Sequence, residues 1–385
     1  MKRLQQLFMV ALVTATILGL TLARPSLAPF YRAEEKLVDD YIVVLKDGVD
    51  VSTIAQQLSV QAEREDVSFR VNRFFTRVLN GLHVYMPSKA LNLVRAHSAV
   101  KYVEENGMVY ASETWGLDRV DQRDLPLDDS YLPTQGDGSG VSIYIIDTGV
   151  RTTHEEFEDR AKFVYDAVEG AVGNGTDCQG HGTHCAGTAA GLVYGVAKKA
   201  NVYGIRTLGC QGSGTWSAVI NGMDWVAKNG DRPAVASMSL GGGGSRSVDD
   251  GVGALHRAGV TVVVAAGNNG DDACTKSPAR APEAITVGAS EIDDSRAYFS
   301  NYGGCVDIFA PGRSITSAWH ERDDQYNTIS GTSMATPHVA GAAALLLSVD
   351  PSLTPAEVTH KLLNSATKDK VTDARNSPNL LLYTP

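Results

Sequence analysis

Three residues with complementary chemistry stand where apolar segments of this chain end or begin. Asp147 directly follows the apolar run 141–146, and His181 lies in the glycine-rich stretch Gly180–His184. Ser333 precedes a long run of small and apolar residues that is typical of a buried helix. A serine hydroxyl is a weak nucleophile unless an imidazole takes its proton and a carboxylate holds that imidazole in place. Together the three residues predict attack on a carbonyl group by Ser333.

Each of these residues also has a simpler explanation when it is taken alone. Serine is a common helix N-cap, aspartate often forms turns, and a single histidine is more often structural than catalytic. The order of Asp147, His181 and Ser333 along the chain excludes some classes of enzyme. A lipase or esterase would need the serine first, in a Gly-x-Ser-x-Gly turn, and the chain has neither. A metallohydrolase built on His181 and His184 lacks further ligands at a suitable spacing.

The elements that would position these residues form an alternating pattern. Strand-like runs at 141–146, 202–205, 235–239 and 260–265 alternate with segments of helical periodicity. This pattern predicts an α/β domain with a mainly parallel sheet that is covered by helices on both faces. Open sheets of this class bind ligands at the carboxyl ends of their strands, which is where Asp147 is expected to lie.

The first hundred residues have a different character. Lys2 and Arg3 precede an uncharged stretch that ends at Ala23, so residues 1–23 are expected to be a signal peptide, with an uncleaved membrane anchor as the alternative. Residues 30–111 contain almost no candidates for catalysis. A small β-α-β-α-β unit is predicted there by strand-like runs at 41–45, 81–85 and 100–103 and helical runs at 53–61 and 90–96.

Composition excludes several classes of function. The chain has 385 residues, of which 43% are hydrophobic and 20% are charged, as in ordinary globular proteins. Its formal net charge is -10, and it has no lysine and arginine cluster of the kind that binds nucleic acid. After residue 23 no segment approaches the roughly 18 consecutive apolar residues of a membrane span. We therefore expect a protein that binds no nucleic acid and, once processed, no membrane.

Three motifs resemble the catalytic signatures of the subtilisin-like serine proteases. They are 145–149 (IIDTG), 180–184 (GHGTH) and 331–338 (GTSMATPH), in the order that this family has. Over about residues 113–385 the chain is similar to the proteinase K branch, near the secreted aqualysin-type enzymes. The resemblance implies a three-layer fold with Asp147 as orienter, His181 as general base and acid, and Ser333 as nucleophile. A catalytically inactive relative would be expected to lack one of these residues.

The resemblance also implies which groups stabilise the transition state. Attack on a peptide carbonyl creates a negatively charged oxygen, which needs hydrogen-bond donors already in place. The segment 265–269 (AAGNN) matches the family segment whose asparagine is such a donor. Asn268 is therefore the expected side-chain donor, and the Ser333 N–H at the positive end of its helix is the second. Pro337 is expected in the first turn of that helix, and His338 as a packed helix residue.

Two extended segments are expected to hold the substrate. The resemblance implies that a peptide binds between them as an added strand, which predicts broad specificity. Ala265, Ala266 and Gly267 would line a roomy pocket without a charged floor, which favours an apolar or aromatic residue before the scissile bond. Trp216 matches an aromatic wall of the cleft, with a core tryptophan as the alternative. The expected substrate-binding residues are Gly212, Ser213, Gly214, Trp216, Ser239, Leu240, Gly241, Ala266 and Gly267.

The five cysteines indicate an oxidising compartment. The resemblance to aqualysin-like enzymes implies that Cys178 pairs with Cys210 and Cys274 with Cys305, and that Cys185 remains a buried thiol. A zinc site is the alternative, but the chain has no Cys-x-x-Cys pair to support it.

Calcium is the one expected cofactor, and no organic cofactor is expected. The family's strong site uses two backbone carbonyls and a carboxylate, and Pro282, Ala284 and Asp307 stand at the matching positions. A second calcium site is expected at a cluster of polar residues, with ordinary solvated side chains as the alternative. These residues are Asp118, Asp121, Gln122 and Asp128.

The small N-terminal unit resembles the inhibitor-type propeptide of this family. The expected organisation is a signal peptide at 1–23, a propeptide at 24–111 with a ferredoxin-like α+β inhibitor domain at about 35–111, and a peptidase domain at 112–385. Cleavage is expected near Val109–Glu113, before Trp115. The resemblance thus implies a secreted, monomeric, self-processing endopeptidase whose substrates are polypeptides.

Asn174 begins a glycosylation sequon.

Overall fold

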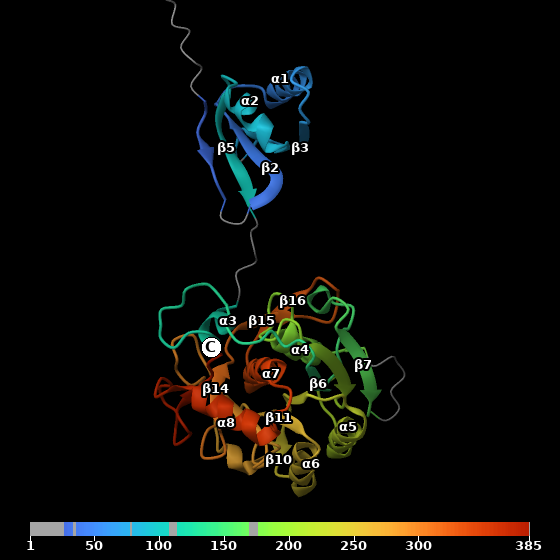
Figure 1. Cartoon of the computed structure of the whole chain (residues 1–385). Helices are drawn as coiled ribbons and strands as arrows, with labels where there is room; N and C mark the ends of the chain where they lie inside the picture. The colour runs from blue at the N-terminus through green and yellow to red at the C-terminus, as the bar shows by residue number, and fades with distance from the viewer. Residues whose placement is uncertain (1–26, 34–35, 78, 108–113, 169–175, 385) are drawn as a thin grey trace, which may run out of the picture. The chain divides into compact units, whose positions relative to one another are not determined.

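The chain forms two compact units, Met1–Tyr110 and Ala111–Pro385 (Figure 1). The computed structural model describes residues 27–33, 36–77, 79–107, 114–168 and 176–384. The expected signal peptide 1–23, the cleavage region Val109–Glu113 and the sequon residue Asn174 lie outside the described residues. The first unit is small and of the α+β class, whereas the second is larger and of the α/β class.

The described part of the N-terminal unit is a five-stranded sheet with two α-helices. Its strands lie in the order β1-β5-β2-β4-β3; β1 is parallel to β5, and the other neighbours are antiparallel. From β2 onward the elements follow one another as β-α-β-β-α-β, which confirms the ferredoxin-like prediction. The elements are β1 (Phe30–Tyr31), β2 (Lys36–Leu45), α1 (Val51–Arg64), β3 (Arg70–Phe75), β4 (Gly81–Tyr85), α2 (Leu91–Arg95) and β5 (Val100–Gly107).

The strand β3 is missing from the sequence-based prediction of this unit. Its sequence, RVNRFF, is mostly polar or exposed because β3 lies at the edge of the sheet and has only one neighbour. The helix α1, by contrast, has the expected apolar spacing. Its N-cap Asp50 accepts a hydrogen bond from the Thr53 N–H at 2.7 Å. Its buried residues, which pack in the core of the unit, are Val51, Ile54, Ala55, Leu58 and Ala62.

The second unit is built on a nine-stranded sheet. Its order is β17-β18-β14-β13-β11-β9-β6-β8-β7, with parallel neighbours throughout except for the β17 and β18 pair. The central strands are buried along their whole length, which explains their continuous apolar sequences. The strands are β6 (Ser142–Asp147), β7 (Ala161–Asp166), β8 (Asn201–Arg206), β9 (Ala234–Met238), β11 (Val260–Ala265), β13 (Ile285–Ser290), β14 (Ile308–Pro311), β17 (Thr367–Lys368) and β18 (Leu380–Leu381).

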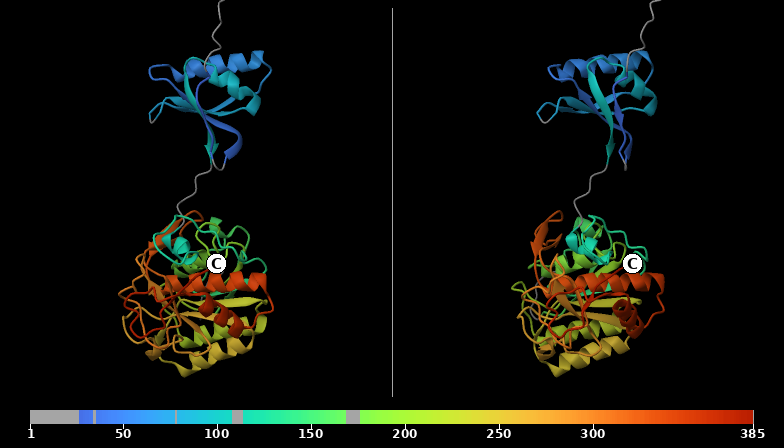
Figure 2. Two further views of the ribbon diagram at one scale, coloured as in Figure 1. Left: turned by 60° about the vertical axis from the view of Figure 1, so that its left-hand side comes forward. Right: turned by 90° about the vertical axis from the view of Figure 1, so that its left-hand side faces the viewer.

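Helices cover both faces of this sheet, which gives three layers (Figures 1 and 2). Successive residues of a strand point to opposite faces, so Ile143 and Ile145 pack with α4, α7 and α8, whereas Tyr144 and Ile146 pack with α5 and α6. The predicted three-layer α/β architecture is therefore confirmed. The helices are α3 (Trp115–Val120), α4 (His181–Ala190), α5 (Trp216–Asn229), α6 (Arg246–Arg257), α7 (Thr332–Val349) and α8 (Pro355–Ser365).

The helix α7 runs through the centre of one helical layer. Among the described residues it is the one helix that is long and apolar enough to cross a membrane, but most of it is buried inside the domain, as in a core helix. Its small residues allow close packing. A Cβ added at Gly341 would lie 2.6 Å from the Val196 Cβ and 2.7 Å from the Ala189 carbonyl oxygen. The predicted buried helix after Ser333 is thus present.

Candidate active site

The carboxyl end of β6 and the amino end of α4 bring Asp147 and His181 together. The Nδ1 atom of His181 lies 2.8 Å from Oδ1 and 3.0 Å from Oδ2 of Asp147, so a protonated Nδ1 donates to the carboxylate. Asp147 is fully buried, and its Oδ1 also accepts from the Thr148 N–H at 2.7 Å. The carboxylate therefore fixes the ring and its tautomer, and Nε2 is left to act in the cleft.

A second buried carboxylate, which the sequence-based prediction did not include, holds the start of α4. The Oδ2 atom of Asp177 accepts from the N–H and the hydroxyl of Thr183, at 2.9 and 2.7 Å. Its Oδ1 accepts from the Thr148 hydroxyl at 2.9 Å. Asp177 thus connects the turn after Asp147 to the helix that carries His181. The signal in the sequence is weak, because Asp177 stands three residues before the N-cap Gly180 and thus outside the usual capping position.

The backbone conformation before His181 requires a glycine. Gly180 is the N-cap of α4 and has a φ of 105°, in the left-handed region that other residues rarely adopt. A Cβ at this position would also lie 2.6 Å from side-chain atoms of Trp319 and His320. The shape of the turn that presents His181 therefore depends on both the conformation and the size of residue 180.

The environment of His181 makes its imidazole a stronger base. Burial is the largest single effect and by itself would lower the pKa of His181. The charge of Asp147, its hydrogen bond to the ring and the neighbouring Cys185 together outweigh burial and raise this pKa well above its ordinary value of 6.5. A stronger base takes the proton of a hydroxyl more readily. The same interaction stabilises the imidazolium ion that forms during the reaction.

The two other buried histidines near these helices serve as structural residues. Burial lowers the pKa of His184 to about 3 and that of His338 to about 4. His184 Nε2 donates to the Ile315 carbonyl at 3.0 Å, and His338 Nδ1 donates to the Met334 carbonyl at 2.8 Å. His184 is thus held by a carbonyl of a distant segment, and His338 is a packed helix residue as predicted.

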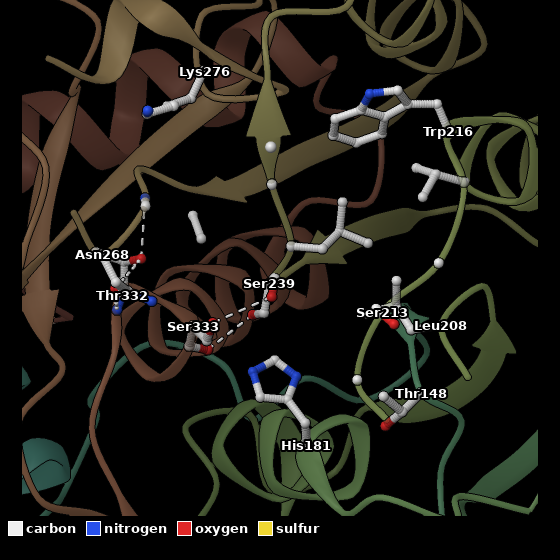
Figure 3. A pocket seen from close by; sticks show the side chains of 18 of the residues that line it. Thr148, His181, Leu208, Ser213, Trp216, Ser239, Asn268, Lys276, Thr332 and Ser333 are labelled. Atoms are coloured by element: carbon white, nitrogen blue, oxygen red, sulfur yellow. Dashed lines mark hydrogen bonds between the residues drawn. The ribbon is translucent and has the colours of Figure 1, made fainter. Parts of the chain in front are cut away.

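Ser333 is the second residue of α7 and lies beside the ring of His181 (Figure 3). Its Oγ donates to the Ser239 carbonyl at 3.2 Å rather than to the imidazole. The hydroxyl must therefore give up its hydrogen bond to Ser239 before Oγ can donate to Nε2. Such catalytic hydrogen bonds are often long or misaligned without substrate, so this geometry is compatible with a nucleophilic role.

Pro337 corrects one expectation and explains how the Ser333 carbonyl is held. It is the sixth residue of α7 and therefore lies beyond the first turn, where proline removes a helical hydrogen bond. The carbonyl that loses its partner is that of Ser333, four residues earlier. This carbonyl instead accepts from the Ser239 hydroxyl at 2.8 Å and from the Cys185 thiol at 3.4 Å. Groups outside the helix thereby hold the backbone of Ser333.

Asn268 is held beside the start of the same helix. Its Oδ1 accepts from the N–H and the hydroxyl of Thr332, at 2.8 and 2.9 Å (Figure 3). Because Oδ1 is occupied, the amide Nδ2 is the atom left to donate elsewhere. The first turn of a helix also leaves its N–H groups without acceptors in the helix, and that of Ser333 belongs to this turn. These two donors could bind one oxygen atom.

A cleft of about 840 Å³ runs past these groups. All nine residues expected to bind substrate line it, from the segments Gly212–Trp216, Ser239–Gly241 and Ala266–Gly267. Trp216 is only partly buried there, which favours the cleft wall over a purely core role. Lys276 also lines the cleft, and the expectation of a pocket without a charged floor stays a prediction. Nothing in the sequence around Lys276 indicated this position.

Comparisons with known proteins identify the family. The Subtilase family matches residues 138–380, which is more than half of the chain, and Peptidase inhibitor I9 matches residues 40–112. The chain belongs to the subtilase family. The N-terminal unit is accordingly of the peptidase-inhibitor type, as the sequence predicted.

Relatives of this subtilase include secreted proteinases. The chain is 48% identical over 375 residues to an extracellular serine proteinase of Thermus sp. (strain Rt41A), covering 92% of this chain and 91% of that protein. It is 42% identical over 390 residues to a cuticle-degrading protease of Metarhizium anisopliae, covering 96% and 97%. A crystal structure of a cold adapted subtilisin-like serine proteinase matches with a TM-score of 0.69 and 53% identity, over 71% of this chain and 99% of that one. This subtilase is therefore an extracellular serine proteinase.

Both expected disulfides are present in the subtilase unit. Cys178 is bonded to Cys210 and Cys274 to Cys305, while Cys185 is a buried free thiol. Because four cysteines form disulfides, they are not zinc ligands. Cys178 and Cys210 connect the segment before α4 to the segment that leads to Gly212, so this bond ties two walls of the cleft together.

The residues of the expected strong calcium site fit a hard cation. Asp307 lies beside the strand that follows Ala284, since its Oδ2 accepts from the Thr286 N–H at 2.7 Å. Burial raises the pKa of Asp307 to about 6, as happens to a carboxylate without a neighbouring positive charge. A bound cation would supply that charge, with the carbonyl oxygens of Pro282 and Ala284 as the other expected protein ligands.

The second expected calcium site has a different arrangement. Both oxygens of Asp118 accept backbone hydrogen bonds, from Asp128 at 3.2 Å and Asp129 at 2.7 Å. Asp121 accepts from the Leu132 N–H at 2.7 Å, and the Gln122 amide donates to the Asp124 and Pro126 carbonyls. In the structure these side chains order the loop 121–132 through hydrogen bonds to its backbone, and a calcium role for them stays a prediction.

Proposed function

We propose that this chain is the precursor of a secreted serine endopeptidase of broad specificity, with Asp147, His181 and Ser333 as its catalytic residues. The observation that carries the proposal is the fully buried Asp147 carboxylate, which is hydrogen-bonded to His181 Nδ1 beside a helix-terminal serine. A peptide bond is the expected substrate because the two segments expected to hold a peptide as an added strand, Gly212–Gly214 and Ser239–Gly241, both line the cleft.

In the proposed reaction, Ser333 Oγ attacks the carbonyl carbon of the peptide bond while His181 Nε2 takes its proton. The carbonyl oxygen becomes negative and is bound by Asn268 Nδ2 and the Ser333 N–H. His181 then gives the proton to the leaving amine, and the C–N bond breaks. A water molecule, deprotonated by the same Nε2, hydrolyses the acyl ester and restores the Ser333 hydroxyl. Asp147 keeps its negative charge throughout and stabilises the imidazolium.

The substrate is proposed to bind as an added strand between Gly212–Gly214 and Ser239–Gly241. Backbone hydrogen bonds are the same for every sequence, so this mode favours broad specificity. The buried alanines Ala265 and Ala266 give one pocket an apolar wall, which favours apolar or aromatic residues before the scissile bond. Trp216 offers a second apolar surface farther along the cleft.

The precursor is proposed to be organised as signal peptide 1–23, propeptide 24–111 and peptidase 112–385. The peptidase-inhibitor family match over residues 40–112 supports the central part of this division. The propeptide acts as an intramolecular inhibitor until the enzyme cleaves the chain before Trp115. The mature enzyme is proposed to be a monomer that binds structural Ca²⁺ through Pro282, Ala284 and Asp307. It is proposed to bind neither nucleic acid nor a membrane.

Intact mass and peptidase activity test this proposal together. The wild-type chain is expected to lose about its first 110 residues and to hydrolyse a chromogenic peptide that ends in phenylalanine, because self-processing uses the same nucleophile as peptide hydrolysis. Ser333→Ala is expected to keep the propeptide and to be inactive. Ser352→Ala, at an exposed serine outside the cleft, is the matched control and should behave like the wild type. Full processing and activity of Ser333→Ala would disprove the proposal.

A further inference from the structure

One cationic side chain at the cleft takes no part in the proposed chemistry. Among the described residues that line the cleft, only Lys276 carries a permanent charge, and the one other titratable side chain is that of His181. The Lys276 side chain is 25% exposed, so it belongs to the wall of the cleft rather than to the open surface. A charge in this position acts on any substrate side chain that comes near it.

The backbone holds Lys276 next to the segment that borders the substrate. Lys276 and Ser277 form the short strand β12 (Lys276–Ser277), which pairs antiparallel with β10 (Gly242–Gly243), and Lys276 lies opposite Gly243. A Cβ added at Gly243 would meet no other atom within 4 Å, so the space on this side is open. Figure 3 shows Lys276 and Trp216 on opposite sides of the segment that follows Ser239.

The side of the cleft that contains Lys276 is the side next to Asn268. Asn268 Nδ2 and the Ser333 N–H fix the reacting carbonyl, and the Cα bonded to that carbonyl carries the side chain that precedes the scissile bond. That side chain must therefore enter the compartment beside Asn268, along the walls formed by Ala265 and Ala266. Its methylene groups would contact apolar atoms, and its end would approach Lys276.

The charge of Lys276 is only partly balanced within the protein. Its Nζ lies 3.1 Å from Asp271 Oδ2, but Asp271 does not line the cleft and its side chain is 47% exposed. An ammonium group has three donors, so this ion pair leaves others for a second carboxylate. An ion pair that is partly open to solvent is weakened by it and can be replaced by a new partner.

We infer that Lys276 is a specificity-determining residue, which makes the proposed peptidase accept glutamate, in addition to apolar residues, before the scissile bond. The inference rests on the proposed function. A glutamate places two methylene groups between its backbone and its carboxylate, so it matches an apolar wall that ends in a cation. Glutamine has the same shape without the charge and is the natural reference substrate.

The test compares peptides that differ only in the residue before the scissile bond, which is phenylalanine, glutamate, glutamine or lysine. The measured quantity is the ratio of kcat/KM for the glutamate peptide to kcat/KM for the glutamine peptide, with the enzyme expressed as the full chain. Lys276→Met is expected to lower this ratio about tenfold, and Lys276→Arg to retain it. Asp271→Asn is expected to raise it, because the competing carboxylate is lost. Added 0.5 M NaCl should lower it in the wild type.

Lys228→Met is the matched control, because Lys228 is a lysine in an exposed ion pair with Asp224 and lies outside the cleft. It should leave the ratio at its wild-type value. A ratio that stays within twofold of the wild type in both Lys276→Met and Asp271→Asn would overturn the inference, and so would a preference for the lysine peptide. Failure of the wild type to cleave any of the peptides would instead count against the proposed function itself.

Discussion

At the scale of single residues, the chemistry depends on how Asp147 changes His181. The carboxylate is completely buried, and its oxygens lie within 3.0 Å of the ring nitrogen. It therefore selects the tautomer with a free Nε2 and favours the protonated ring. The consequence is a base whose pKa lies above the ordinary value, so the activity should depend on pH in a predictable direction.

We predict that kcat/KM of the wild type falls as the pH decreases, with an apparent pKa above 6.5. The base must be neutral to accept a proton, and the raised pKa of His181 means that protonation begins at a higher pH than for a free histidine. Asp147→Asn should move this acid limb to lower pH, because burial without the carboxylate lowers the pKa. It should also reduce kcat by about 10⁴-fold.

The measurement is a pH–rate profile of both enzymes, with Asp324→Asn as a control at an exposed, ion-paired aspartate. An acid limb at the same pH in wild type and Asp147→Asn would show that Asp147 does not control the base.

At the scale of elements, the positions of the proposed catalytic residues could be predicted because each of them stands at the end of a strongly patterned segment. The strand β11 (Val260–Ala265) has its predicted bounds, and β6 and α7 begin or end within one residue of Asp147 and Ser333. The periodicity of a buried strand or helix is a local property of the sequence. The positions of site residues next to such elements can therefore be predicted from the sequence.

The residues that could not be predicted depend on contacts between distant segments. Asp177 acts by bonding to Thr148, 29 positions away, and Lys276 lines the cleft because β12 pairs with β10. Pro337 is tolerated beyond the first turn because Ser239, 94 positions from Ser333, replaces the missing donor. No short-range pattern encodes such contacts.

The anchoring of α3 gives a prediction about stability. Arg119 on α3 is fully buried, and its guanidinium donates to both oxygens of Asp294, at 2.6 and 3.0 Å. Arg119→Met removes one partner and leaves a buried, unpaired carboxylate, which should lower the free energy of unfolding by about 3–5 kcal/mol. Urea unfolding of the Ser333→Ala form measures this without self-digestion. Lys228→Met, which breaks an exposed ion pair, should have no measurable effect on the free energy of unfolding. An equally small effect of Arg119→Met would show that the pair of Arg119 with Asp294 does not stabilise the fold.

At the scale of the whole molecule, the subtilase unit is stabilised by links between loops as well as by its core. Two disulfides close segments with sequence separations of 32 and 31 residues, and each should contribute about 3–4 kcal/mol in the chain-entropy model. The proposed calcium ion would add a further link, between Asp307 and the loop that contains Pro282. Such links suit an enzyme that works outside the cell, where disulfides persist.

We predict that EDTA lowers the melting temperature of the mature enzyme and that Asp307→Asn removes most of this effect. A ligand that binds only the folded state stabilises it, and loss of the carboxylate weakens the binding of a hard cation. Calorimetry with and without EDTA measures the difference, with Asp324→Asn as the exposed control. If EDTA lowers the melting temperature of Asp307→Asn as much as that of the wild type, Asp307 does not hold the ion. The same experiment on Asp118→Asn then tests the second expected calcium site.

The most direct test of the account is to ask whether Ser333 is an activated nucleophile. A sulfonyl fluoride reacts with a serine hydroxyl whose proton an adjacent base removes, and ordinary serines of the chain lack such a base. The measurement is peptide mass spectrometry after treatment of the mature enzyme. The account predicts one adduct per molecule, on the peptide that contains Ser333. It predicts no adduct when His181→Ala, from which the propeptide has first been removed with an added protease, is treated in the same way. An adduct on a different serine, or equal labelling of Ser333 without His181, would contradict the proposed mechanism.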